Sequence, residues 1–119
     1  MNADRAPYAW QITYDHLDHR RDDVSGPRNA DEKLLAGLAA AVILGRASWQ
    51  PADDVEWFRM YDGDGNLYYT GVLTGQPDPC GSEGGFEPLD DYGTPNAGCT
   101  SIKYLTGRDE SGKEIWEQL

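Results

Sequence analysis

Long apolar runs are scarce in this sequence, and their absence excludes whole classes of protein. No stretch approaches the roughly 20 apolar residues that a membrane-spanning helix needs. Residues 1–7 also lack the long apolar run of a secretory signal. We therefore expect a cytoplasmic protein that does not enter a membrane.

Positively charged residues are also scarce. The chain has 10 lysines and arginines against 21 aspartates and glutamates, which gives a formal net charge of −11. Between Met60 and Ile102 there is no lysine, arginine or histidine. A strongly negative protein repels nucleic acids and anionic membranes. We expect no direct binding of DNA, RNA or lipid, and a partner that is itself basic.

Cysteine is rare as well, and the two that occur do not predict a framework of bridges. Cys80 and Cys99 lie at the two ends of one long loop, so a bridge between them stays open if the fold brings them together. A reducing compartment leaves both as thiols. We expect free thiols, with the bridge as the alternative.

What the sequence does have is a strong hairpin signal. Residues 57–61 and 67–73 are rich in aromatic and β-branched side chains, and between them lies a block of Asp, Gly and Asn at 62–66. Such residues tolerate positive φ and form tight turns. Because both strands carry apolar residues on both faces, we expect a central hairpin that is covered on each side. Gly71 should mark a bulge or a close approach of two backbones.

The turn also resembles the start of a calcium loop. Asp62, Asp64 and Asn66 stand at alternate positions, as the first oxygen ligands of such a loop do. Leu67, however, occupies the position that needs glycine, and Leu73 the position of the bidentate glutamate. We therefore interpret the block as a turn and predict no metal here.

Periodicity assigns most of the remaining elements. Residues 8–15 alternate, with Tyr8, Trp10, Ile12 and Tyr14 on one face, and this pattern predicts a strand. The charged segment 16–28 should be an exposed loop. A helix should run from about 30 to 44, capped by Asn29 with Glu32. Two ridges should form its buried stripe: Leu34, Leu38 and Val42, and Leu35, Ala39 and Ile43. Trp49 should anchor the connector that follows.

The C-terminal part adds one long loop and a second hairpin. Residues 75–98 have no regular period, although Phe86, Leu89 and Tyr92 are spaced three apart and should pin the second half to the core. Strands are expected at 99–106 and 113–119, with an exposed turn between them. The whole chain, 1–119, thus predicts one α+β domain: a single twisted antiparallel sheet of about five strands with one helix packed on it, in the order strand-helix-strand-strand-strand-strand.

Parts of the sequence resemble a known group. Residues 58–62, 68–71, 86–93 and 95–98 are similar to small acidic proteins of actinobacterial genomes and their phages, whose activity is uncharacterised. The resemblance covers about half of the chain and omits the helix. It implies a self-contained small domain from a mobile element and carries over no site residues.

The sequence gives little support for a catalytic site or a metal site. His16 and His19, with Cys80 and Cys99, could supply four metal ligands, but structural zinc sites pair their ligands at short spacing. Adjacent carboxylates such as Asp90 and Asp91 rarely face each other across a cleft, as acid–base catalysis on a glycoside requires. We expect no enzyme and no cofactor. The alternative is a metal-binding or small hydrolytic domain.

The functional hypothesis therefore rests on charge. The expected partner-binding residues are Asp62, Asp64, Tyr68, Phe86, Glu87, Asp90, Asp91 and Tyr92, carboxylates with aromatic anchors beside them. They predict a non-enzymatic protein-interaction module for a basic partner. One version is a mimic of nucleic acid that occupies a DNA- or RNA-binding protein. The alternative is that these acids only solvate turns.

Overall fold

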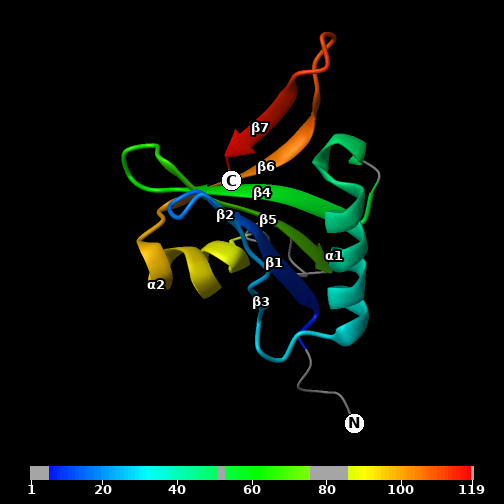
Figure 1. Cartoon of the computed structure of the whole chain (residues 1–119), viewed down its shortest axis with the longest axis vertical. Helices are drawn as coiled ribbons and strands as arrows, with labels where there is room; N and C mark the ends of the chain where they lie inside the picture. The colour runs from blue at the N-terminus through cyan, green and yellow to red at the C-terminus, as the bar shows by residue number, and fades with distance from the viewer. Residues whose placement is uncertain (1–5, 51–52, 76–85, 119) are drawn as a thin grey trace.

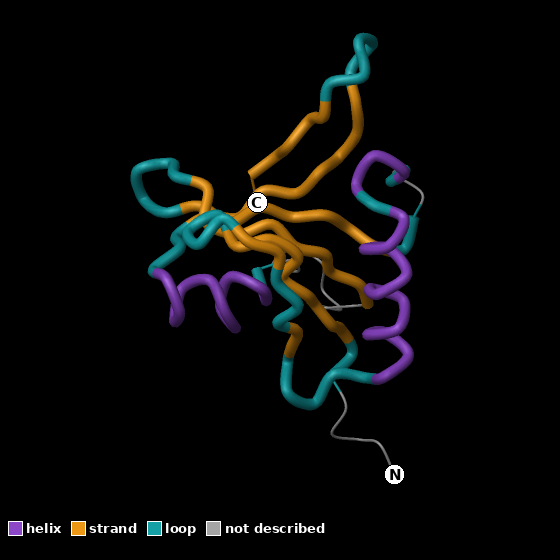
Figure 2. Tube along the Cα trace, in the orientation of Figure 1, coloured by secondary structure: helices purple, strands orange, loops and turns teal. Residues whose placement is uncertain are grey.

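The computed structural model describes residues 6–50, 53–75 and 86–118, which form one sheet with helical segments on both of its faces (Figures 1 and 2). The strands are β1 (Tyr8–Asp15), β2 (Arg20–Arg21), β3 (Ser25–Gly26), β4 (Val55–Tyr61), β5 (Leu67–Gly75), β6 (Ser101–Arg108) and β7 (Glu114–Gln118). The helices are α1 (Glu32–Leu44), the 3₁₀ turn η1 (Arg46–Ser48), the π-helical turn η2 (Leu89–Gly93) and α2 (Thr94–Ala97).

The sheet is antiparallel throughout, and its spatial order is β2-β1-β5-β4-β6-β7, with β3 paired to β1. The hairpin of β4 and β5 lies at its centre, joined by the turn at 62–66. Apolar side chains pack on both faces. One core lies under α1 and contains Ala9, Leu38, Trp57, Val72 and Leu105. The other lies under η2 and contains Trp10, Ile12, Phe58, Met60 and Ile102.

These findings confirm an α+β fold with a single antiparallel sheet, but the expected count of about five strands is wrong. The sheet has seven, because part of the segment 16–28 pairs with β1 instead of forming only a loop. Backbone bonds hold it there: Asp22 N–H donates to Thr13 O and Ile12 N–H donates to Val24 O. The side chains of β2 are exposed, so this pairing leaves no alternating apolar pattern.

The start of α1 also needs correction. Asp31 caps the helix by accepting the Lys33 N–H at 2.8 Å, in place of the expected Asn29. Residues 27–30 are used differently: Ala30 N–H donates to Pro27 O, and Ala6 N–H donates to Asn29 O. This turn keeps the residues before Asp31 out of the helix.

The first predicted ridge of α1 reaches the core, and the second does so only at Leu35. Leu38 is buried, and Leu34, Leu35 and Val42 are half-buried against the sheet. Ala39 and Ile43 are exposed, and Ile43 keeps 85% of its surface. The helix packs mainly on β1, β5 and β4 (Figure 1). Within the described chain, the expected wide stripe is therefore covered along its first ridge and, on its second ridge, only at Leu35.

A bulge reverses the predicted face of Tyr14. Trp10 pairs with Leu73 and Ile12 with Gly71, but the register shifts so that Tyr14 pairs with Thr70. Because side chains alternate along a strand, this shift moves Tyr14 to the face opposite Trp10 and Ile12. The predicted close approach at Gly71 is confirmed. A Cβ there would lie 2.4 Å from Gln11 O and 2.5 Å from Phe58 Cζ.

The long segment 75–98 is more regular than predicted in its second half. Residues 87–97 form two connected helical turns, η2 and α2, and Leu89 is buried while Phe86 and Tyr92 pack against the same core. The predicted anchoring of this segment to the core is thus confirmed, but the segment is mostly helical and not a loop. Residues 76–85, including Cys80, lie outside the described chain. Trp49 is buried, as predicted, and its Nε1–H donates to Val55 O at 2.6 Å.

Candidate functional site

The hairpin turn uses its first carboxylate for its own structure. Asp62 Oδ1 accepts the N–H groups of Asp64 and Asn66 at 2.9 and 2.8 Å, and Oδ2 accepts Asn66 Nδ2–H at 3.0 Å. The bonds from Asn66 lower the pKa of Asp62 to about 2. Among the residues that the structure describes, no three potential metal ligands lie close enough to hold an ion. Asp62 therefore fixes the hairpin turn. Asp64, in the same turn, is exposed.

A more elaborate arrangement surrounds Asp91 in η2. Its Oδ2 atom accepts two hydrogen bonds of 2.9 Å, one from the Tyr8 hydroxyl and one from Trp10 Nε1. Both donors lie on β1, more than 80 residues away in the sequence. Burial, followed by the bond to Asp91, raises the pKa of Tyr8, so its hydroxyl stays protonated and remains a donor. The carboxylate of Asp91 is thus held in one position.

This carboxylate lies at the edge of a shallow groove with a volume of about 460 Å³. We call it the Asp91 groove; its lining residues are Trp10, Val24, Ser25, Gly26, Pro27, Arg28, Asp91 and Tyr92. The rings of Trp10 and Tyr92 are 5.5 Å apart between centroids and tilted by 50°. The groove therefore combines the half-buried Tyr92 ring, the edge of the buried Trp10 ring, the fixed Asp91 carboxylate and the positively charged Arg28.

Local packing explains why the groove forms here. Tyr92 lies edge-on against Tyr69 of β5, with 5.1 Å between ring centroids. On the other side, β3 lies directly against the Trp10 ring, because Gly26 has no side chain. A Cβ at Gly26 would be 2.4 Å from Trp10 Cζ2. The indole is thus fixed between β3 and η2, with its N–H directed at Asp91.

The structure divides the predicted site residues into separate groups. Asp91 and Tyr92 line the groove, whereas Asp90 does not, and both aspartates are exposed. Glu87 is half-buried and acts with Asp90 and Asp91 on the nearby Tyr8. The remaining predicted residues lie outside the groove: Asp62 and Asp64 in the hairpin turn, and Tyr68 and Phe86 against the core.

The sequence analysis missed several residues that line the groove or hold Asp91 in place. Tyr8 and Trp10 gave only a strand pattern, and Arg28 belonged to a segment interpreted as an exposed loop. No local signal in the sequence links these residues to Asp91, because the contact depends on how η2 crosses the sheet. Arg28 is the one basic residue that lines the groove among the described residues.

Comparisons with known proteins supply no further assignment: no family model, curated protein or solved structure matches the chain. Within the described ranges, no helix is both long enough and apolar enough to cross a bilayer.

Proposed function

We propose that this protein is a non-enzymatic interaction module that binds a basic side chain of a partner protein in the Asp91 groove. The observation that carries the proposal is the Asp91 carboxylate, fixed by Tyr8 and Trp10 at 2.9 Å beside the rings of Trp10 and Tyr92. A carboxylate forms charge-assisted hydrogen bonds with lysine or arginine, and aromatic faces attract the same cations. Fixing the acceptor in advance lowers the entropy cost of binding.

The surroundings of the groove favour a basic partner over longer distances. Glu87 and Asp90 both act electrostatically on Tyr8, so three carboxylates gather near the groove. The span from Met60 to Ile102, which contains η2 and α2, has no positively charged residue. Such a surface increases the rate of encounter with a positively charged protein.

Arg28 limits what the groove can accept. It supplies a positive charge to the lining, and Asp91 supplies the only carboxylate there among the described residues. A single basic side chain at Asp91, with polar or acidic groups toward Arg28, matches this distribution better than a continuous run of cations. The proposed occupant is therefore one lysine or arginine of a folded partner or a peptide.

The wider biological setting belongs to the same proposal. A DNA- or RNA-binding protein is one basic partner of this kind, and a nucleic-acid mimic encoded by a mobile element would act on such a protein. We place the interaction in the cytoplasm. Cys99 is buried. Burial raises the pKa of that thiol to about 11, so it is not a reactive nucleophile.

The test compares Asp91→Asn with Asp90→Asn. Asparagine keeps an oxygen that can accept from Tyr8 and Trp10, so the first change removes the charge with little loss of structure. The second removes the same charge from the adjacent exposed residue. Isothermal titration with a short arginine- and lysine-containing peptide should show binding weakened about tenfold or more by Asp91→Asn, because hydrogen bonds to charged groups contribute about 1.5–3 kcal/mol.

The expected loss for Asp90→Asn is less than about twofold, because Asp90 does not line the groove and a side chain bound at Asp91 does not contact it directly. Equal losses of affinity in the two variants would show that Asp91 acts only through the net charge of the protein. Failure of the parent protein to bind the peptide at low salt would overturn the proposal.

A further inference from the structure

β3 is an edge strand that lies directly beside the Asp91 groove. It pairs with β1 alone, so the other side of Ser25 and Gly26 has no neighbouring strand within the described chain (Figure 1). Residues 24–28 line the groove on this side, and residues 91–92 of η2 line it on the other. The free backbone groups of an edge strand can pair with another chain in extended conformation.

The hydrogen-bond pattern directs the backbone groups of Ser25 to this free side. In an antiparallel pair, residues that bond to the partner strand alternate with residues whose N–H and C=O point away from it. Ile12 N–H donates to Val24 O at 2.7 Å, so Val24 and Gly26 bond toward β1. Ser25 lies between them and is exposed. Its N–H and C=O therefore point away from β1 and can bond to an added strand.

Gly26 and Val24 face the groove side of this edge. Trp10 is the register partner of Gly26 and belongs to the core under η2, so Gly26 and Val24 both lie on the η2 face. The six-membered part of the Trp10 ring covers Gly26, because a Cβ there would lie 2.4 Å from Cζ2 and 2.8 Å from Cε2. Val24 lines the groove and keeps 37% of its surface exposed. A strand added beside β3 therefore places every second side chain next to the Trp10 ring and Val24.

A side chain opposite Gly26 has a short route to the Asp91 carboxylate. Gly26 has no side chain in the way, and the Trp10 ring that covers it donates through Nε1 to Asp91 Oδ2 at 2.9 Å. Residues directly opposite each other in antiparallel strands have Cα atoms about 4.5–5.5 Å apart. A side chain from the added strand must therefore cross the indole to reach Asp91. Lysine and arginine are long enough, and their apolar stems can lie along the ring.

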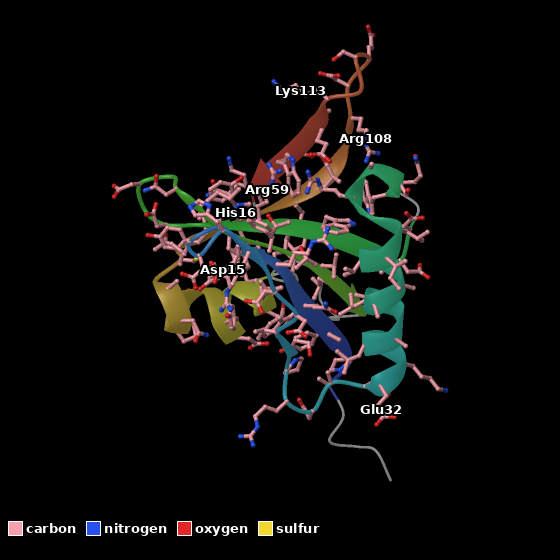
Figure 3. The ribbon with its side chains drawn as sticks, in the orientation of Figure 1. Asp15, His16, Glu32, Arg59, Arg108 and Lys113 are labelled. Atoms are coloured by element: carbon pink, nitrogen blue, oxygen red, sulfur yellow. The ribbon has the colours of Figure 1, made fainter. Side chains whose placement is uncertain are left out.

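The basic residues of the protein leave this position to a cation from the partner. Arg108 and Lys113 lie at the end of the molecule formed by β6 and β7, away from β3 and η2 (Figure 3). Arg28 lines the groove, but it follows Gly26 along the chain and lies on the opposite side of it from Val24. Cationic and apolar groups of a partner are thus favoured toward Asp91 and Val24, and acidic or polar groups toward Arg28.

We infer that the partner binds as an extended segment that pairs antiparallel with β3, with a lysine or arginine opposite Gly26 and an apolar residue opposite Val24. This inference rests on the proposed function, since the basic residue is the one that Asp91 binds. Antiparallel pairing lets a single residue of the segment, opposite Ser25, bond to both of its free groups. The recognised sequence is a basic residue, then any residue, then an apolar residue.

The probe is the capped peptide acetyl-Ser-Thr-Arg-Thr-Val-amide, titrated at low salt by calorimetry. N-methylation of the threonine after the arginine removes the N–H that bonds to Ser25 O. This change should weaken binding about fivefold or more, because a backbone bond is lost and the methyl group keeps the strands apart. The matched control moves the methyl group to the arginine nitrogen, which points away from β3. It should change the affinity less than about twofold.

A second peptide tests the order of the recognised residues. Acetyl-Val-Thr-Arg-Thr-Ser-amide has the same composition, but its valine lies two positions before the arginine and therefore toward Arg28. It should bind about threefold or more weakly than the first peptide, because it loses the apolar contact with Val24. Equal affinities would overturn the assignment of an apolar residue opposite Val24.

The protein offers a matched pair of variants at the same position. Ser25→Pro removes the N–H that faces the partner and no bond to β1, and edge strands tolerate proline at such positions. Ser25→Ala keeps the N–H and removes only the hydroxyl. We expect a loss of about fivefold or more for Ser25→Pro and less than about twofold for Ser25→Ala. The methylated peptides decide the question if Ser25→Pro does not fold, because they use the unchanged protein.

The inference and the proposed function fail in different ways. Binding that depends on Asp91 but tolerates both methyl groups would overturn strand pairing and keep the groove as the site. A loss caused only by the methyl group on the arginine would overturn the antiparallel register. No binding of the unmethylated peptide at low salt would overturn the proposed function, and this inference with it.

Discussion

At the scale of single residues, His16 shows how the fold controls a charge. The side chain is half-buried next to Thr70 and Tyr14. Burial lowers its pKa below the ordinary value of 6.5, and Arg59 lowers it further, while Asp15 acts in the opposite direction. The folded protein thus keeps the imidazole neutral to a lower pH than the unfolded chain does.

This difference predicts that the protein loses stability as the pH falls. Below about pH 6.5 the unfolded chain binds a proton at His16 before the folded protein does, so the free energy of unfolding decreases by at most about 1.4 kcal/mol per pH unit for one proton. The loss begins near the unfolded pKa and continues down to the folded pKa. Urea unfolding should show a smaller slope in this window for His16→Gln than for the parent protein.

The control for this prediction is His19→Asn. His19 is exposed and has a positive φ of 54°, a conformation that asparagine tolerates. This variant should retain the parent slope. An unchanged slope in His16→Gln would show that His16 does not carry the acid sensitivity.

At the scale of elements, α1 is an apolar helix of which only one side is used. Its sequence, from Leu34 to Leu44, is almost entirely aliphatic, but Leu38 is its one fully buried residue. Ile43 and Leu44 keep 85% and 70% of their surface. The stability cost of substituting an aliphatic residue in α1 should therefore depend on whether that residue faces the core, and much less on how hydrophobic it is.

We predict that Leu38→Asp lowers the free energy of unfolding by at least about 3 kcal/mol, because it removes a buried aliphatic side chain and buries an unpaired carboxylate. Ile43→Asp, which makes the same chemical change one turn and a residue later, should cost less than about 1 kcal/mol, within the range of surface substitutions. Chemical denaturation measures both. Similar costs at the two positions would mean that the second ridge of α1 is covered in solution.

At the scale of the whole molecule, the Asp91 groove and the register pair Arg59 and Lys103 lie on opposite faces of the sheet. The groove lies on the η2 side, whereas Arg59 is two residues from Trp57 of the core under α1 and therefore lies, with Lys103, on the α1 side. A negatively charged face should attract a basic partner over several ångströms, and salt should weaken that attraction by shortening the Debye length from about 10 Å at 0.1 M to about 3 Å at 1 M.

Removing charge near the groove should have the same effect as adding salt. We predict that the combination Glu87→Gln, Asp90→Asn and Asp91→Asn slows association with a basic peptide and reduces its salt dependence, while the melting temperature changes little. Stopped-flow measurements across a salt series test this. The matched control removes three exposed charges elsewhere: Glu32→Gln, Glu110→Gln and Glu117→Gln.

The control should slow association much less than the groove combination does. Asp109 is unsuitable for it, because its Oδ1 atom accepts bonds from Ser111 and Lys113 and shapes the turn between β6 and β7. Equal effects of the two combinations would leave net charge as the whole cause of the attraction.

The sequence by itself determined the elements whose signals are local. The central hairpin followed from two aromatic and β-branched runs around an Asp-Gly-Asn turn, and β1 followed from strict alternation. The anchoring of Phe86, Leu89 and Tyr92 also followed from their spacing. In each case the backbone preferences of neighbouring residues and the burial of one face act within a few positions of each other. A short run of consecutive residues is therefore enough to predict the element.

The tertiary structure alone decided which distant residues meet. Tyr8 and Trp10 reach Asp91 only because η2 packs across β1, and Arg59 faces Lys103 only because β4 pairs with β6 in one register. A single bulge moved Tyr14 to the other face, and the packing of α1 on the sheet buried Leu38 and left Ile43 exposed. Register, bulges and twist depend on many weak contacts between residues that are far apart in the sequence. They therefore cannot be predicted from any short stretch of it.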